Sequence, residues 1–236
     1  GGMIPVAYVY PPEMRSTRDL LRRRTYLMRK RAELLVHVQN TNSQYNLPEI
    51  GKKIAYRANR SGVAQRFSDP AVQTSIAADL SWIDFYDTLL TRLELFITSQ
   101  AKQQDHHSFY LLRSVPGIGK ILALTILYEI HDITRFPRVQ EFVSYCRLVK
   151  CSRQSAGKNY GFSGKKIGNV HLKWAFSEAA VLFLRHNPEG QKLLARLERK
   201  HGKAKALTLL AHKLARAVYF ILRREKAFDL TQFLAA

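Results

Sequence analysis

Two long stretches with apolar residues at three- and four-residue steps constrain the fold of this chain more than any other feature. The first runs from Glu13 to about Asn42 and the second from Pro70 to about Gln104. Spacing near a heptad is typical of long helices that pack along one another. The sequence therefore predicts an antiparallel coiled-coil hairpin over residues 13–106, with core or dimer contacts along its apolar stripes. The recurring apolar residues are Leu20, Leu21, Leu27, Leu34, Leu35 and Val38, then Ile76, Leu80, Ile83, Leu90, Leu93 and Ile97.

Residues 107–236 show shorter helical stretches separated by glycine and proline, and they predict a compact C-terminal helical domain. The expected helices cover residues 111–131, a stretch from about 136, and then 170–185, 188–200 and 203–224. Residues 1–12 hold three prolines and two glycines, which favours an extended remnant of a preceding domain. Because no set of alternating strands occurs, the predicted fold class is all-α.

The charge of the chain indicates a nucleic-acid partner. The formal net charge is +20 and the isoelectric point is about 10.2, in the range where a basic footprint predicts phosphate contacts. An anionic membrane is the rival partner, but no apolar run approaches the roughly 20 residues of a spanning helix, so we expect no membrane contact. Two cysteines form neither a disulfide framework nor a complete zinc set, which indicates a reduced, intracellular chain.

The positive charge is concentrated in the segment Cys146–Trp174, because no Asp or Glu occurs between Glu141 and Glu178. A glycine-bearing segment of one sign predicts a loop that binds a polyanion. Ser155 lies in its middle, and a small hydroxyl among cations is suited to attack on a phosphodiester. The alternative is that Ser155 only caps a helix or contacts a phosphate. The cations of the segment are Arg147, Lys150, Arg153, Lys158, Lys165, Lys166 and Lys173.

Two shorter motifs predict backbone contacts to nucleic acid. The run Ser114–Ala123 has the form of a helix-hairpin-helix turn, in which a helix start presents free N–H groups to a phosphate. The alternative is an ordinary turn between packed helices. The run Gly164–Trp174 places Asn169 where it caps a helix, with two further side chains facing the polyanion or merely the surface. The residues assigned to nucleic acid in these two motifs are Pro116, Gly117, Gly119 and Lys120, then Asn169, His171 and Lys173.

Acidic residues show no convincing metal site in this sequence. Two-metal phosphoryl transfer needs several carboxylates that converge on Mg²⁺. Asp84 and Asp87 lie on the second long helix, where we expect them to be solvated, and Glu129 and Asp132 flank a helix end as weak candidates. The histidines lack ligand spacing, and His106-His107 is interpreted as a linker.

Three runs in the C-terminal half resemble the C-terminal domain of transposases of insertion-sequence family 110 (the 110/116/902 group). In order, they are LLRSVPGIGKILALTILYEI, ITRFPRVQEFVSYCRLV and RQSAGKNYGFSGKKIGNVHLKWAFSEAA. The resemblance covers about residues 108–225. The preceding run, YVYPPEMRSTRDLLRRR onward, is similar to the coiled-coil segment before that domain.

The resemblance implies a recombinase that is guided by a structured bridge RNA pairing with donor and target DNA. In this family a ribonuclease-H-like (RuvC-type) domain supplies four acidic Mg²⁺ ligands. The C-terminal domain supplies a serine that forms a covalent phosphoserine link to DNA. The two domains meet from different protomers of a dimer or tetramer. On this sequence the serine corresponds to Ser155 of QSAG, with Ser152 and Ser163 as less favoured neighbours.

The first functional hypothesis is thus the coiled-coil and serine-bearing part of such a transposase. It would bind DNA and bridge RNA in the cytoplasm of a bacterium or archaeon, at the nucleoid. The ribonuclease-H-like domain is missing from this sequence, so we expect DNA cleavage only when that domain and its Mg²⁺ are supplied. The alternative hypothesis is a non-catalytic helix-hairpin-helix accessory module in which Ser155 only contacts phosphate.

Overall fold

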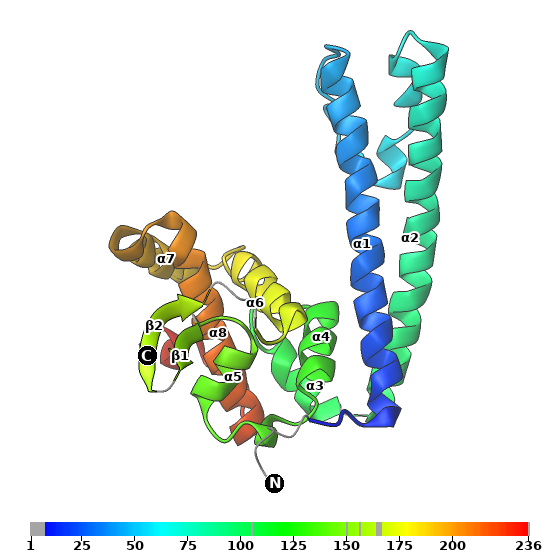
Figure 1. Ribbon diagram of the computed structural model, residues 1–236. Coiled ribbons are helices and arrows are strands. Elements are labelled where there is room, and N and C mark those ends of the chain that lie inside the picture. The colour runs from blue at the N-terminus through cyan, green and yellow to red at the C-terminus, as the bar shows by residue number, and fades with distance from the viewer. Residues whose placement is uncertain (1–7, 105, 150, 156, 164–166, 236) are drawn as a thin grey trace. The chain divides into compact units, whose positions relative to one another are not determined.

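A computed structural model describes residues 8–104, 106–149, 151–155, 157–163 and 167–235 (Figure 1). For residues 101–104, 151–155, 159, 160, 162 and 163 it describes the backbone alone. Helices dominate these residues, so the predicted all-α class is confirmed, with one small β-hairpin in addition. The chain divides into two compact units, Asp19–Ser99 and a second unit made of Gly1–Arg18 and Gln100–Ala236.

The described elements are α-helices, three short 3₁₀ turns (η) and two strands. In chain order they are α1 Pro12–Gln44, η1 Arg57–Asn59, η2 Ala64–Arg66, α2 Pro70–Gln104, α3 His106–Arg113, α4 Lys120–Ile130, η3 Ile133–Arg135, α5 Val139–Tyr145, β1 Cys151–Ser155, β2 Lys158–Ser163, α6 Val170–Phe183, α7 Pro188–His201, α8 Lys203–Arg224 and α9 Leu230–Ala235.

In the unit Asp19–Ser99, α1 and α2 lie antiparallel (Figure 1). Four α2 residues at seven-residue steps, Ile76, Ile83, Leu90 and Ile97, are at most 5% exposed. This period keeps one stripe of a helix against its neighbour along its whole length. The buried stripe of α2 therefore has the spacing predicted from the sequence, while a supercoiled geometry stays a prediction.

Ion pairs across the two helices fix their register. Arg24 donates to Glu94 with an N–O distance of 2.6 Å, and Arg31 donates to Asp87 at 2.5 Å. A seven-residue step up α1 is thus matched by a seven-residue step down α2, as antiparallel packing requires. Partial burial of Asp87 opposes ionisation, but hydrogen bonds from Arg31 and Arg60 lower the pKa of its carboxyl group.

The segment between the helices is held by a buried arginine. Arg60 is 5% exposed and donates to the backbone oxygens of Ile54 and Ala55 at 2.9 Å each. Its guanidinium also pairs with Asp84 and Asp87. The expectation that these two aspartates are simply solvated is therefore wrong, because their partners come from a connecting segment whose path the local sequence does not give.

The second unit is built around α8, which contacts α3, α5, α6 and α7. The apolar helices α4 and α6 pack against each other within the same core. Phe142 of α5 lies at its centre, with its ring 6.1 Å from Phe176 and 5.9 Å from Tyr219. The Tyr219 hydroxyl donates to the Phe136 backbone oxygen at 3.0 Å, so this buried polar group is satisfied.

The extended residues before α1 belong to the second unit. Tyr10 is buried and its hydroxyl donates to the backbone oxygen of Tyr128, and burial raises the pKa of this hydroxyl. The Arg135 guanidinium lies 3.8 Å from the centre of the Tyr8 ring and 4.9 Å from that of Tyr145. These contacts join residues 8–10 to α4 and α5.

Three local expectations are wrong. The cationic segment is not a loop throughout, because residues 151–163 form a two-stranded antiparallel sheet. His106 and His107 begin α3 and are not a linker, and α9 follows α8 where no helix was expected. Within the described part of the chain, no helix combines the length and the apolarity that crossing a bilayer needs.

Candidate nucleic-acid interface

The hairpin β1–β2 places Ser155 at its turn end. Ser155 pairs with Lys158, and Gly157 between them has a φ of +74°, a conformation that glycine adopts without strain. Cys151 pairs with Ser163 and Ser152 with Phe162, so the other two candidate serines lie at the opposite end of the hairpin. The three serines are thereby separated along the hairpin.

The predicted cations of this segment divide into three groups. Lys158 and Lys173 have exposed side chains, and His171 is half-buried in the first turn of α6. Arg153 is described by its backbone in β1 alone, while Lys150, Lys165 and Lys166 lie outside the described residues. Exposed lysines therefore occur at the turn end of the hairpin (Lys158) and in the first turns of α6 (Lys173).

Arg147 has a structural contact that the sequence did not predict. Its Nε donates to the Gly168 backbone oxygen at 2.6 Å, and the Asn169 N–H donates to the Tyr145 oxygen at 2.6 Å. Gly168 has a φ of +100°, and a Cβ atom there would lie 2.6 Å from the Tyr145 oxygen. These contacts hold together the two ends of the segment 147–168, which contains the hairpin.

Asn169 is the centre of a buried polar network at the start of α6. Its Oδ1 accepts the N–H groups of His171 and Leu172 at 2.9 and 3.0 Å, so the predicted helix cap is confirmed. Its Nδ2 donates to Glu129 Oε2 at 2.7 Å. Glu129 and Asn169 are 3% and 9% exposed. Asn169 therefore positions α6, and its side chain is not presented to a ligand.

We expect Asn169→Ala to lower the free energy of unfolding by about 2–3 kcal/mol, because it removes the cap and a hydrogen bond of a buried carboxylate. Asn187→Ala is the matched control. Asn187 caps α7 through the Gly190 N–H at 3.0 Å, and its Nδ2 has no partner among the described residues. The control should cost about 1 kcal/mol. Urea unfolding measures both, and equal losses would show that the Glu129 bond adds nothing.

Glu129 is the acidic residue that the sequence reasoning undervalued. It is the one acid in the apolar run of α4, ILALTILYEI, and this isolation was the available signal. Asp132 has a separate role, since its Oδ1 accepts the Thr134 N–H at 2.7 Å and caps η3. Hydrogen bonding by Thr134 lowers the pKa of Asp132. Among the described residues, no three His, Cys, Asp or Glu side chains gather as a metal site.

The turn between α3 and α4 has an exposed side and a packed side. Pro116, Gly119 and Lys120 are exposed at the start of α4, while Ile118 is 3% exposed and packs inward. Gly117 has a φ of +86° and lies against the backbone of α6. A phosphate is thus able to approach the α4 N-terminus at Gly119 and Lys120, while Gly117 serves packing; the helix-hairpin-helix assignment stays a prediction.

Comparison with known proteins places this region in a family. Residues 110–195, from α3 into α7, match the model of the Transposase IS116/IS110/IS902 family. These residues belong to that transposase family. The matched part of the chain contains the α3–α4 turn, the hairpin and the Asn169 network, so the family match and the cationic site coincide.

Curated relatives agree with this family. The Transposase for insertion sequence element IS1111A of Coxiella burnetii is 30% identical over 122 residues, covering 50% of this chain and 33% of the relative. The Pilin gene-inverting protein of Moraxella bovis is 32% identical over 131 residues, covering 52% and 39%. An Insertion element IS110 protein of Streptomyces coelicolor is 30% identical over 121 residues, covering 50% and 29%. The chain thus spans about a third of the length of these relatives.

Proposed function

We propose that this chain is the DNA-binding C-terminal part of an insertion-sequence transposase and supplies Ser155 as the nucleophile for DNA strand cleavage and exchange. The observation that carries the proposal is the hairpin within the family-matched residues, which has Ser155 at its turn end and lysine at the paired position. An oxygen nucleophile next to a cation is suited to a phosphodiester, whose charge the cation offsets.

The base of the hairpin supports this role. The Arg147–Gly168 bond brings together residues that flank the hairpin in the chain, and the buried Asn169–Glu129 pair holds the start of the helix that follows it. A nucleophile must be held in place to gain from proximity to its phosphate. The exposed α4 N-terminus at Lys120 then offers a second backbone contact that carries no sequence preference.

Metal ions and other partners complete the proposal. Mg²⁺ would activate the reaction through carboxylates of an acidic domain outside these 236 residues. A bridge RNA would select the DNA sites. A homo-oligomer would form through the α1–α2 hairpin, where Trp82, Phe85 and Phe96 are each more than half exposed along α2.

Salt-dependent DNA binding tests the nucleic-acid part of the proposal. We expect the chain to bind duplex DNA weakly, with log affinity falling by about 0.9 per neutralised phosphate for each decade of salt. The double variant Lys158→Ala, Lys173→Ala should have a smaller salt slope. Lys200→Ala, which removes an exposed cation of α7, should change it little. Fluorescence anisotropy across a salt series measures the slope, and affinity indifferent to salt would contradict the proposal.

A non-catalytic DNA-binding accessory module is the second candidate, favoured by the exposed α3–α4 turn. The transposase and the accessory module differ in whether they form a covalent protein–DNA adduct. A covalent protein–DNA adduct, formed when the acidic domain is supplied in trans, requires the transposase, whereas the accessory module forms none under any condition.

A further inference from the structure

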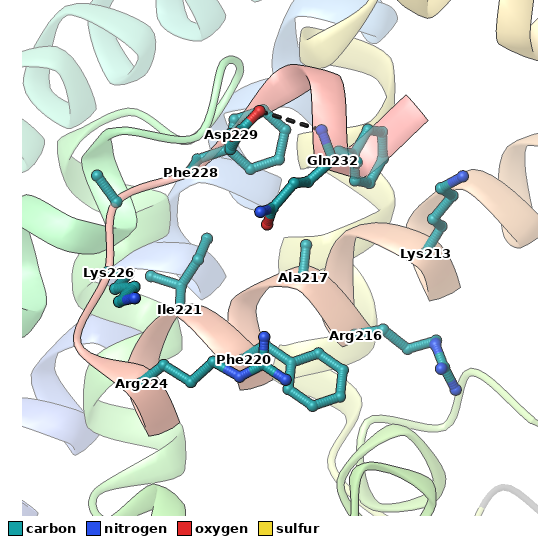
Figure 2. A pocket seen from close by; sticks show the side chains of 12 residues that line it. Lys213, Arg216, Ala217, Phe220, Ile221, Arg224, Lys226, Phe228, Asp229 and Gln232 are labelled. Carbon is teal, nitrogen blue, oxygen red and sulfur yellow. Dashed lines mark hydrogen bonds between the residues drawn. The ribbon is translucent and has the colours of Figure 1, made fainter. Parts of the chain in front are cut away.

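A cavity of about 340 Å³ lies between α8 and the C-terminal segment that follows it (Figure 2), and its described lining includes no residue of the hairpin. One wall is the face of α8 that carries Ala217, Phe220 and Ile221, and the opposite wall holds Phe228 and Gln232. In Figure 2 the Gln232 amide points into the space above α8.

The C-terminal wall is fixed in place by specific contacts. Glu225 ends α8 with a φ of +53°, which turns the chain back over the helix. The Phe228 N–H donates to Ser114 Oγ at 2.8 Å, and the Phe233 ring is 6% exposed with its centre 5.3 Å from that of Phe183. The cavity is therefore preformed, as small-ligand sites usually are.

Cations surround an apolar and aromatic floor. The Arg224 guanidinium lies 4.7 Å from the centre of the Phe220 ring, and Lys213 Nζ lies 5.1 Å from that of Phe233. The one acid of the lining, Asp229, accepts the Gln232 N–H at 3.0 Å and so caps α9. The four cations in the lining are Lys213, Arg216, Arg224 and Lys226.

This combination selects a ligand with three properties. An aromatic floor with a guanidinium beside it favours a flat π-system, and the cations favour an anion attached to it. The Gln232 amide offers one acceptor and two donors, which suits the edge of a base. Burial and the nearby Arg196 lower the pKa of the Lys213 amine, and the negative charge of a phosphate beside it would favour the charged amine.

We propose that this cavity binds one unpaired nucleotide of a DNA or RNA strand, with the base against Phe220 and the phosphate at the cationic rim. The inference rests on the proposed function, which brings nucleic acid to this unit. A paired base is stacked within its duplex and cannot enter, so the cavity discriminates single-stranded from duplex segments. An acidic peptide would use the cations but not the aromatic floor, and is the less suitable occupant.

Binding of a base-bearing strand compared with an abasic strand of equal length tests the proposal. Phe220→Leu keeps an apolar side chain but removes the ring, and should weaken binding of single-stranded DNA or RNA about tenfold. Binding of the abasic strand and of duplex DNA should not change. Tyr110→Leu is the matched control, since it removes a ring that is 58% exposed on α3 of the same unit. Gln232→Ala, at an exposed position, should also weaken only the base-bearing strand.

Ultraviolet cross-linking gives a second readout that does not depend on the variants. A strand carrying bromouracil should cross-link to the peptides that contain Phe220 and Phe228 in the wild-type chain, and thymidine monophosphate should compete weakly. Parallel DNA and RNA arms show which polymer enters. Competition by the free nucleotide without any cross-link of the strand would overturn the strand as occupant.

The outcomes separate this proposal from the proposed function. If duplex DNA binds with the expected salt slope but Phe220→Leu and Gln232→Ala leave the base-bearing strand unaffected, the cavity assignment alone is wrong. Equal weakening of base-bearing and abasic strands would overturn it as well. If the wild-type chain binds no nucleic acid, both proposals fail.

Discussion

Ser155→Ala should abolish a covalent protein–DNA adduct that Ser152→Ala leaves intact. In the proposed reaction the serine oxygen forms a bond to phosphorus, and the bond from phosphorus to a deoxyribose oxygen breaks, with that oxygen taking a proton. Alanine offers no oxygen, so the loss should be complete. The assay combines the chain with the acidic domain in trans, Mg²⁺, bridge RNA and labelled donor DNA, and a denaturing gel reveals the adduct.

The position of each serine in the hairpin makes the controls informative. Ser152 and Ser163 lie at the end of the hairpin opposite Ser155. A DNA phosphate that is held at the turn is therefore closer to Ser155 than to either of them. Ser155→Ala should retain the salt-dependent DNA affinity of the wild type, which excludes a loss through unfolding. An adduct that persists in Ser155→Ala would assign the nucleophile to another residue.

The long helices could be predicted from the sequence because their signals are local. The α2 range Pro70–Gln104 follows from proline at the first helical position, apolar residues at heptad steps and the preceding Asp69, whose Oδ1 accepts the Ala71 N–H at 2.7 Å. The α8 range Lys203–Arg224 could be predicted equally well, because Gly202 precedes it and its apolar residues form one stripe. Apolar periodicity and helix capping depend on neighbours within a few residues. They can therefore be recognised in the sequence without any knowledge of the tertiary structure.

Features that depend on distant partners could not be predicted. Nothing in the local sequence around Asp84 and Asp87 indicates that Arg60 forms ion pairs with them. Likewise, nothing in the sequence around Glu129 indicates that Asn169 donates a hydrogen bond to it. The hairpin was missed because its strands, CSRQS and KNYGFS, are only five and six residues long, and beyond the pair Tyr160 and Phe162 they show no apolar alternation. The cationic character of the site was therefore predictable, whereas the internal bonds that organise it were not.

The glycines of the α3–α4 turn illustrate the same limit within one motif. In the sequence Gly117 and Gly119 both serve a tight turn next to phosphate. In the structure Gly119 has an ordinary φ of −78° and nothing within 4 Å of a built Cβ. A Cβ on Gly117, by contrast, would lie 2.5 Å from the Phe183 nitrogen and 2.8 Å from the Leu182 carbonyl carbon.

Gly117→Ala should therefore destabilise the C-terminal unit by about 3 kcal/mol or more, because the new methyl group meets backbone atoms of α6 at a residue that also needs a positive φ. Gly119→Ala should change the free energy of unfolding by less than about 1 kcal/mol, since the loss of a glycine at the helix start is partly offset by a stiffer unfolded chain. Urea unfolding followed by Trp174 fluorescence measures both variants, in a Trp82→Phe background.

This pair also separates stability from binding at one turn. If Gly119 approaches a phosphate, Gly119→Ala should weaken duplex DNA binding while the unfolding midpoint stays near that of the wild type. Gly117→Ala should mainly lower the stability of the fold. Any loss of DNA binding by this variant should be proportional to the fraction of chain that is unfolded. Equal stabilities for the two variants would mean that α6 does not pack on Gly117, and the arrangement of α3, α4 and α6 described above would then be wrong.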